Sequence, residues 1–235
     1  MKIGLLNIAT NRYLEFAENL YDSADKYFLS NSGLEIHYFL FTNIPDKIRR
    51  DNVKVIEQEH YPWPGMTLRR YEIFCKNSEE LSEMDYLYYC DIDMLFVDFV
   101  GNEIIGDLVA TRHPGYWNQV PDTLPYDRNP ASKAFVPRDQ GQQYYAGGFN
   151  GGTSENFLRM SRDIYNNIQE DQKIGYIAEW HDESHMNRYF LDNPPSVILD
   201  PSYCFPRDAV WAQNHPYRQY MKLCALEKDH KAFQV

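Results

Sequence analysis

Residues 1–90 alternate between short apolar runs and amphipathic segments. Between residues 14 and 28 apolar side chains recur at helical spacing, and the neighbouring apolar runs have the length of buried strands. The pattern predicts strands over residues 3–9, 36–42, 53–57 and 86–90, and helices over residues 14–28 and 68–81. This order of elements predicts an α/β sheet that begins at the amino end.

Beyond residue 95 the pattern is less regular. It predicts a strand over residues 108–112, a long loop over 114–137 that is rich in Pro, Asn and Asp, and helices over 154–170 and 182–191. Long loops inside compact domains often carry function. Because no repeat or linker divides the 235 residues, we expect a single domain over residues 1–235.

Composition narrows the possible partners. Hydrophobic residues make up 43% of the chain and charged residues 24%, which is typical of a folded globular protein. The formal net charge of −11 argues against nucleic acid or an anionic membrane as the main partner, since both need clustered cations. A nucleotide is still compatible with this charge, because its site needs only a metal ion and an arginine or two.

The spacing of the cysteines and the residues at the amino end indicate the cellular compartment of the protein. The four cysteines (Cys75, Cys90, Cys204 and Cys224) form no CxxC pair, so we expect reduced thiols rather than a zinc ribbon or redox motif. The apolar segment within residues 1–10 is too short for a signal peptide, and no apolar run is long enough for a membrane helix. These features predict a cytoplasmic protein with no transmembrane segment.

Asp91 and Asp93 directly follow the apolar strand over residues 86–90. Side chains two apart on an extended chain point to the same side, so the two carboxylates would repel each other without a cation. Mg²⁺ and Mn²⁺ favour oxygen ligands, and open α/β sheets bind ligands at the carboxyl ends of their strands. We therefore interpret the pair as a site for a divalent ion that carries a diphosphate. A solvated turn is the alternative.

A glycine cluster occupies residues 147–152. Its spacing fits neither a dinucleotide fold nor a P-loop. Four glycines around a Phe-Asn pair let the backbone approach a ligand or a packed element closely. A tight turn with bulges is the other interpretation.

Residues 180–185 place two histidines and two acids beside Trp180. His181 and His185 are four apart, as in zinc proteases, although the acid between them is not where that motif needs it. Alternatively, Asp182 and Glu183 bind sugar hydroxyls and stabilise a positive anomeric carbon. The third interpretation is ordinary: Asp182 caps a helix and Glu183 faces water.

Several single residues are weaker candidates. Arg70 opens the helix before the acid pair and could bind a diphosphate or the acids themselves, or simply lie on the surface. His113 follows a predicted strand and is either a site histidine or a structural one. Lys228, His230 and Lys231 form a basic tail that either closes over phosphates or is solvated.

The acid pair, the glycine cluster with the tyrosines before it, and the segment over 180–185 stand in one order along the chain. Together with residues 98–101 and 113–115 they resemble the family 6 retaining glycosyltransferases, which include the blood group A and B transferases and α-1,3-galactosyltransferase. The resemblance spans residues 3 to about 230. It implies a GT-A fold and transfer of galactose or N-acetylgalactosamine from a UDP-sugar to a galactoside, with the α-configuration retained.

The resemblance also implies roles for individual residues. Asp91 and Asp93 match the acids that hold Mn²⁺, or Mg²⁺ in its place, on the UDP diphosphate. Glu183 matches the carboxylate below the anomeric carbon, a nucleophile or an ion-pair stabiliser. The residues that match donor contacts are Ile8, Ala9, Tyr13, Arg70, Ala146, Gly147, Gly148, Asp182 and Lys228. Those that match acceptor contacts are His113, Tyr116 and Trp180. Residues 1–95 would then form the nucleotide-binding part, and the remainder the acceptor-binding part and tail.

The chain also departs from the family pattern. It has no membrane anchor or stem like those of the animal enzymes, which suggests a bacterial or viral soluble form, and it keeps both acids where many bacterial relatives have asparagines, which favours metal dependence. Cys204 and the two residues after it stand where the animal enzymes bind the acceptor with a Trp-Asp pair. Gly148 lacks a side chain and would leave space at C2 of the sugar, which favours UDP-N-acetylgalactosamine over UDP-galactose.

We therefore expect a metal-dependent retaining transferase that acts on a galactose-terminated glycan, with the α-1,3 linkage implied by the resemblance alone. Two alternatives stay open. A zinc hydrolase would use His181 and His185 and would hold zinc tightly. A carbohydrate-binding module without turnover would bind glycans through its aromatic side chains, with no need for UDP or Mn²⁺.

Overall fold

The structure is a computed structural model that describes residues 1–229 and 233. Every strand and helix predicted from the sequence is present, with shifts at the ends. The predicted strands correspond to β1 (Lys2–Ile8), β2 (Glu35–Thr42), β3 (Val53–Glu57), β4 (Tyr86–Cys90) and β6 (Leu108–Arg112). The predicted helices correspond to α1 (Ala17–Tyr27), α2 (Gly65–Lys76) with α3 (Ser78–Leu81), α4 (Ser154–Lys173) and α5 (His181–Asp192).

Within the described residues, seven strands form a mixed sheet in the order β3-β2-β1-β4-β7-β6-β8. The four strands β3, β2, β1 and β4 run parallel to one another, whereas β7 is antiparallel to both β4 and β6. The predicted α/β sheet at the amino end is confirmed. The predicted boundary between two functional parts near residue 95 stays a prediction.

Five strands were not predicted: β5 (Met94–Phe96), β7 (Tyr145–Thr153), β8 (Val197–Leu199), β9 (Phe205–Pro206) and β10 (Leu223–Ala225). The most important is β7, which contains the whole glycine cluster. Glycine has a low strand propensity, so this segment is extended because strands pair with it on both sides. The alternative of a tight turn is wrong, although a register shift does occur opposite Ala110 and Thr111.

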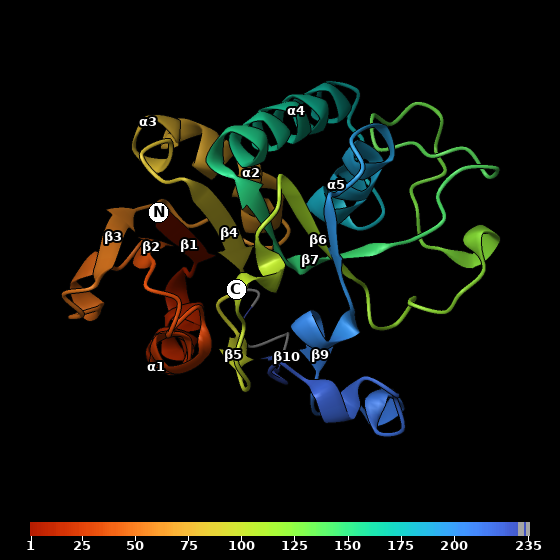
Figure 1. Cartoon of the computed structure of the whole chain (residues 1–235). Coiled ribbons are helices and arrows are strands. Elements are labelled where there is room, and N and C mark those ends of the chain that lie inside the picture. Colours follow the sequence, from red (N-terminus) through yellow and green to blue (C-terminus); the bar gives the residue numbers. More distant parts are fainter. Residues whose placement is uncertain (230–232, 234–235) are drawn as a thin grey trace.

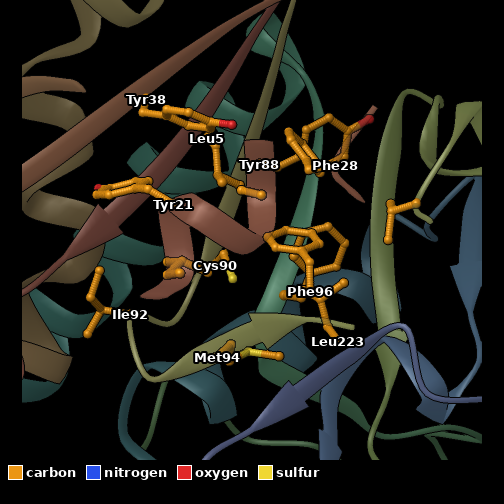
Figure 2. Close-up of a cluster of buried hydrophobic side chains, with 14 of the residues drawn as sticks. Leu5, Tyr21, Phe28, Tyr38, Tyr88, Cys90, Ile92, Met94, Phe96 and Leu223 are labelled. Carbon is orange, nitrogen blue, oxygen red and sulfur yellow. The ribbon is translucent and has the colours of Figure 1, made fainter. Parts of the chain in front are cut away.

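Two apolar layers cover the two faces of the large sheet. In Figure 1, α4 lies on one side of this sheet and α1 on the other. On one face, Leu6 and its neighbours pack under α2, α4 and α5. On the other face, Leu5 and Tyr88 pack against α1 and against a small sheet in the order β5-β10-β9. Figure 2 shows Phe96 and Leu223 of the small sheet in this second layer. Burial on both faces explains why β1 is apolar at successive positions.

The predicted long loop is confirmed, and two buried aspartates fix its shape. Asp127 accepts hydrogen bonds from the Tyr176 hydroxyl (2.9 Å) and from the Glu179 N–H (3.0 Å). Asp171 on α4 accepts from the Ser132 hydroxyl (2.6 Å) and from a loop N–H. These charge-assisted bonds anchor the loop to α4 and to the approach to α5.

None of the helices among residues 1–229 and 233 is both long and apolar enough to cross a bilayer.

We expect Gly151→Ala to lower the free energy of unfolding by about 2 to 3 kcal/mol, measured by urea titration. A Cβ at residue 151 would lie 2.3 Å from Tyr88 Cδ1 and 2.5 Å from the Leu87 carbonyl oxygen. That oxygen belongs to the paired backbone of β4, so it cannot move aside without disturbing the sheet.

Gly33→Ala is the control for this steric effect. Gly33 has a φ of +70°, but a Cβ there would meet nothing within 4 Å. Only the left-handed backbone is strained, which costs about 1 kcal/mol. Equal losses in the two variants would contradict the proposed clash.

Candidate active site

The site lies at the carboxyl ends of β1 and β4, which are parallel neighbours. The Asn7 side chain on β1 donates a hydrogen bond to the Cys90 carbonyl (2.7 Å), which fixes the two strand ends side by side. They border a cavity of about 270 Å³. Six predicted residues line it: Ile8, Tyr13, Arg70, Asp91, Asp93 and Lys228. Ala9 lies beneath this surface and is fully buried.

Asp91 and Asp93 lie on this edge close enough for their charges to interact, as predicted. Burial of Asp93, and then the charge of Asp91, raise the pKa of the Asp93 carboxyl. The Lys228 ammonium forms an ion pair with Asp93 and opposes this shift. A cation therefore already accompanies the acid pair, and the oxygen donors suit a Mg²⁺ or Mn²⁺ ion. His230 and Lys231 of the predicted basic tail lie outside the described residues.

Arg70 connects the acid pair to the other carboxylates of the site. Its Nε lies 3.1 Å from Asp182 Oδ2, and its Nη2 lies 3.5 Å from Asp91 Oδ1. Its Nη1 donates to the Gly147 carbonyl (3.0 Å), and the guanidinium stacks over the Tyr89 ring. Of the alternatives for Arg70, contact with the acid pair is confirmed for Asp91. The surface interpretation is wrong because the side chain is largely buried, and binding of a diphosphate stays a prediction.

Asp182 and Glu183 open α5 and point into the site rather than to solvent. Burial raises the pKa of Asp182 to about 6, and the charge of Arg70 opposes the shift. Burial raises the pKa of Glu183 to about 7, although the Gly147 N–H donates to its carboxylate at 2.7 Å. The interpretation of Asp182 as the helix cap is wrong, because Trp180 occupies the N-cap position of α5. Asp182 forms an ion pair with Arg70.

The Gly147–Gly148 backbone bridges the two groups of acids. The Gly148 carbonyl accepts from the Asp91 N–H (2.9 Å), while the Gly147 N–H donates to Glu183. The space beside Gly148 is not open, contrary to expectation. A Cβ there would lie 2.9 Å from Cys204 Sγ and 3.0 Å from Asp91 Oδ2. Ala146, one residue earlier on β7, is also buried.

The predicted acceptor residues His113 and Tyr116 belong to one cluster of rings. The rings of His113 and Tyr116 are 4.7 Å apart, and that of Tyr116 is 5.6 Å from the ring of Tyr144. The buried Tyr144 hydroxyl faces Glu183 closely enough to interact with its carboxylate. Burial lowers the pKa of His113 to about 4, so the ring is neutral. Trp180 is 45% exposed and precedes α5, which leaves its ring free to stack on a sugar.

The two histidines of the zinc alternative do not share a helix face. His181 has a φ of 53°, and its ring packs edge-on against Trp63 at 5.1 Å. His185 is buried, with Nε2 3.5 Å from Asp171 in the loop anchor. Within residues 1–229 and 233, no three His, Cys, Asp or Glu side chains converge as they would at a catalytic zinc.

Comparison with known proteins identifies the family. Residues 1–234 match the sequence profile of glycosyltransferase family 6. The chain belongs to glycosyltransferase family 6. The resemblance inferred from the sequence motifs is therefore confirmed, as is the GT-A type of α/β fold. A family 6 glycosyltransferase takes a nucleotide-sugar donor and a glycan acceptor.

Relatives of this glycosyltransferase occur in animals and bacteria. It is 33% identical to histo-blood group ABO system transferase 1 of Rattus norvegicus, over 99% of this chain and 68% of that protein. It is 32% identical to human globoside alpha-1,3-N-acetylgalactosaminyltransferase 1, over 97% and 67% of the two chains. It is 30% identical to the O-antigen biosynthesis glycosyltransferase WbnI of Escherichia coli, over 88% of each chain.

Nine residues that line the cavity were not predicted from the sequence. The missed residues are Thr10, His60, Tyr61, Trp63, Met66, Thr67, Tyr89, Ile92 and Phe233. Three of them, His60, Tyr61 and Trp63, belong to the segment between β3 and α2, which follows the carboxyl end of a parallel strand and holds two prolines. Because open α/β sheets bind ligands at the carboxyl ends of their strands, the position of this segment after β3 could have predicted that it lines the cavity. No local pattern indicated that Phe233 lines the cavity, because its contacts with Tyr13 and Phe16 join the two ends of the chain.

We expect Arg70→Met to lower the free energy of unfolding by about 3 kcal/mol, because it leaves Asp182 buried without its cation. Urea titration at neutral pH measures this loss. Arg69→Met is the matched control one residue away. Arg69 forms a more exposed ion pair with Glu72, so its loss should cost less than about 1 kcal/mol. Similar losses in both variants would show that the buried ion pair contributes little.

Proposed function

We propose that this glycosyltransferase transfers N-acetylgalactosamine from UDP-N-acetylgalactosamine, with retention, in α-1,3 linkage to a galactose-terminated glycan. UDP-galactose is the second candidate donor. One observation carries the proposal: the Gly147–Gly148 backbone bridges Asp91 to Glu183, so that the acid pair and a buried carboxylate share one site. A sugar diphosphate has the same two parts, a charged leaving group and a reacting carbon.

The cavity supports binding of the nucleotide. Tyr13, Trp63 and Tyr61 offer flat faces for a base or a ribose, and the acid pair lies at the cavity edge. Asp91 and Asp93 would hold Mn²⁺ or Mg²⁺, which would supply Lewis-acid neutralisation of the diphosphate.

The chain itself supplies the other charges. The guanidinium of Arg70 lies at this edge of the cavity, and so does the ammonium of Lys228. Both cations can offset negative charge on a departing diphosphate.

Glu183 is the proposed catalytic carboxylate. Retaining transfer passes through an oxocarbenium-like state, which a nearby anion stabilises. The Gly147 N–H orients the Glu183 carboxylate toward the glycine bridge, and Asp182 is positioned by Arg70 to accept hydrogen bonds from sugar hydroxyls. His113, Tyr116 and Trp180 offer neutral, aromatic surfaces, against which we place the acceptor.

The donor assignment draws on the relatives rather than on Gly148. The human relative is named an N-acetylgalactosaminyltransferase, which supports UDP-N-acetylgalactosamine. Comparison of kcat/KM for the two UDP-sugars tests the assignment, and a strong preference for UDP-galactose would refute it.

UDP affinity should depend on both the metal and the acid pair. We expect calorimetry to give at least about tenfold tighter binding of UDP with Mn²⁺ than without it, and Asp91→Asn/Asp93→Asn to abolish the difference. A carbohydrate-binding module would instead bind glycans without UDP. If UDP affinity were indifferent both to Mn²⁺ and to the double substitution, the metal-diphosphate assignment would be wrong.

Glu183→Gln should bind UDP as the wild type does and lose at least about two orders of magnitude in transfer rate. The pKa of Glu183 is about 7 and the anion is the active form, so we expect the wild-type rate to fall below that pH. The rate of Glu183→Gln should lack this acid limb. The measurement is kcat from pH 5 to 9, and a variant that keeps the wild-type rate or its acid limb would remove Glu183 from the mechanism.

A further inference from the structure

The first residues of β7 extend beyond the end of β4. The strand β7 spans Tyr145–Thr153, but β4 pairs with it from Phe149 onward. On the other side of β7 the register shifts after Ala146, so that three residues of β7 lie between two neighbouring residues of β6. Gly147 lies in this stretch, so its position depends on groups outside the sheet.

Two side chains of α5, which lies beside β7, bond to this stretch as a neighbouring strand would (Figure 1). Asn187 Oδ1 accepts from the Tyr145 N–H, and Asn187 Nδ2 donates to the Tyr145 carbonyl, both at 2.8 Å. Two residues along β7, the Gly147 N–H donates to Glu183 at 2.7 Å. Alternate residues of a strand present their N–H and carbonyl groups to the same edge, so the two side chains follow one edge of β7.

The spacing of the helix fits the spacing of the strand. Residues four apart on an α-helix are about 6 Å apart along its axis, and residues two apart on a strand are about 6.6 Å apart. Glu183 and Asn187 are four apart in the sequence, and Gly147 and Tyr145 are two apart. Because the two distances nearly match, bonding of Asn187 to Tyr145 brings Glu183 to Gly147.

Asn187 is buried, and every polar group of its side chain is bonded to the backbone. Besides its two bonds to Tyr145, its Nδ2 donates to the Glu183 carbonyl at 3.0 Å. An amide has two N–H donors, so one nitrogen can bond to the strand and the helix together. Asparagine is a poor helix former, and burial of an amide is costly unless it is bonded. The residue therefore serves the contact between α5 and β7 rather than the helix itself.

Apolar packing also holds α5 against β7, but it does not set the register. The Tyr145 ring packs edge-on against Phe190 of α5 at 5.4 Å, and Met186 is fully buried in the same apolar layer. Apolar contacts are non-directional and tolerate small shifts of a helix. Hydrogen bonds require a defined distance and angle, so the amide of Asn187 restricts the helix to one position.

We infer that Asn187 is a positioning residue, whose amide sets the register of α5 against β7 and thereby holds the Glu183 carboxylate at the Gly147 N–H. The inference rests on the proposed function, in which Glu183 faces the reacting carbon. Asn187 acts through Glu183, because its own amide is already bonded to backbone groups. Misplacement of a catalytic group by about 1 Å can lower a rate about a hundredfold.

Asn187→Leu removes the three hydrogen bonds and provides the first test. With the better of the two UDP-sugars, kcat should fall at least about thirtyfold, while the Kd of UDP with Mn²⁺ should stay within about threefold of the wild-type value. Asn193→Leu is the matched control, because Asn193 Nδ2 donates to the Tyr189 carbonyl at the other end of the same helix. This control should keep kcat within about threefold of the wild-type value. Equal losses in the two variants, or a UDP affinity that falls as much as kcat, would overturn the inference.

A double-mutant cycle separates positioning from a general loss of stability. If Asn187 acts through Glu183, Asn187→Leu should lower kcat by less than about threefold in a protein that already carries Glu183→Gln. Circular dichroism gives the folded fraction of each variant, and each rate is expressed per folded molecule. A purely structural role would give the same fold-loss in both backgrounds, and that result would overturn the inference.

Asn187→Ser covers the case in which the larger leucine prevents folding. The shorter side chain leaves room for a water molecule that can bond to the Tyr145 groups, but the water does not fix the register of the helix. We expect the loss of kcat at unchanged UDP affinity to recur. A serine variant with a kcat within about threefold of the wild-type value would overturn the inference.

The two proposals fail in different ways. A wild-type protein that neither binds UDP nor transfers a sugar would refute the proposed function. A protein that does both and depends on Glu183, but keeps its kcat in Asn187→Leu and Asn187→Ser, would refute only the role of Asn187.

Discussion

The buried guanidinium of Arg70 holds the active edge of the sheet together. From α2 it forms an ion pair with Asp182 on α5, approaches Asp91 after β4, and donates to the Gly147 carbonyl on β7. Four elements far apart in the sequence therefore meet at one cation. Arginine suits this position because its planar fork offers several donors in fixed directions. Without such a cation, the carboxylates of the site would have to be buried next to one another unpaired.

The site concentrates negative charge where the protein can least solvate it. Burial raises the pKa of Asp182 and Glu183 to about 6 and 7, and it also raises the pKa of Asp93. The charged forms of these acids are held at a cost in stability, as is common at catalytic sites. This arrangement also explains how a chain of net charge −11 can accommodate an anionic nucleotide-sugar. Local cations, and not the overall charge, determine the sign at the cavity.

Much of the fold and part of the site could be predicted from local patterns. The apolar period located β1 to β4 and the long helices, and the position of Asp91 and Asp93 after β4 placed them on the edge that borders the cavity. The glycine-rich β7 could not be predicted in this way, because its extended form depends on pairing with β4 and β6. The expectation of open space beside Gly148 was wrong for a related reason. A residue from much later in the chain, Cys204, fills it.

The sequence by itself determined the class of the protein: the order of strands and helices, the acid pair, and the motifs of family 6. These features are local, since each depends on spacing within a few residues. The tertiary structure decided which side chains share the site, namely the contact of Arg70 with Asp182 and of Cys204 with Gly148. Such contacts join residues more than fifty positions apart. They depend on how whole helices and strands pack, so they cannot be predicted from spacing along the chain.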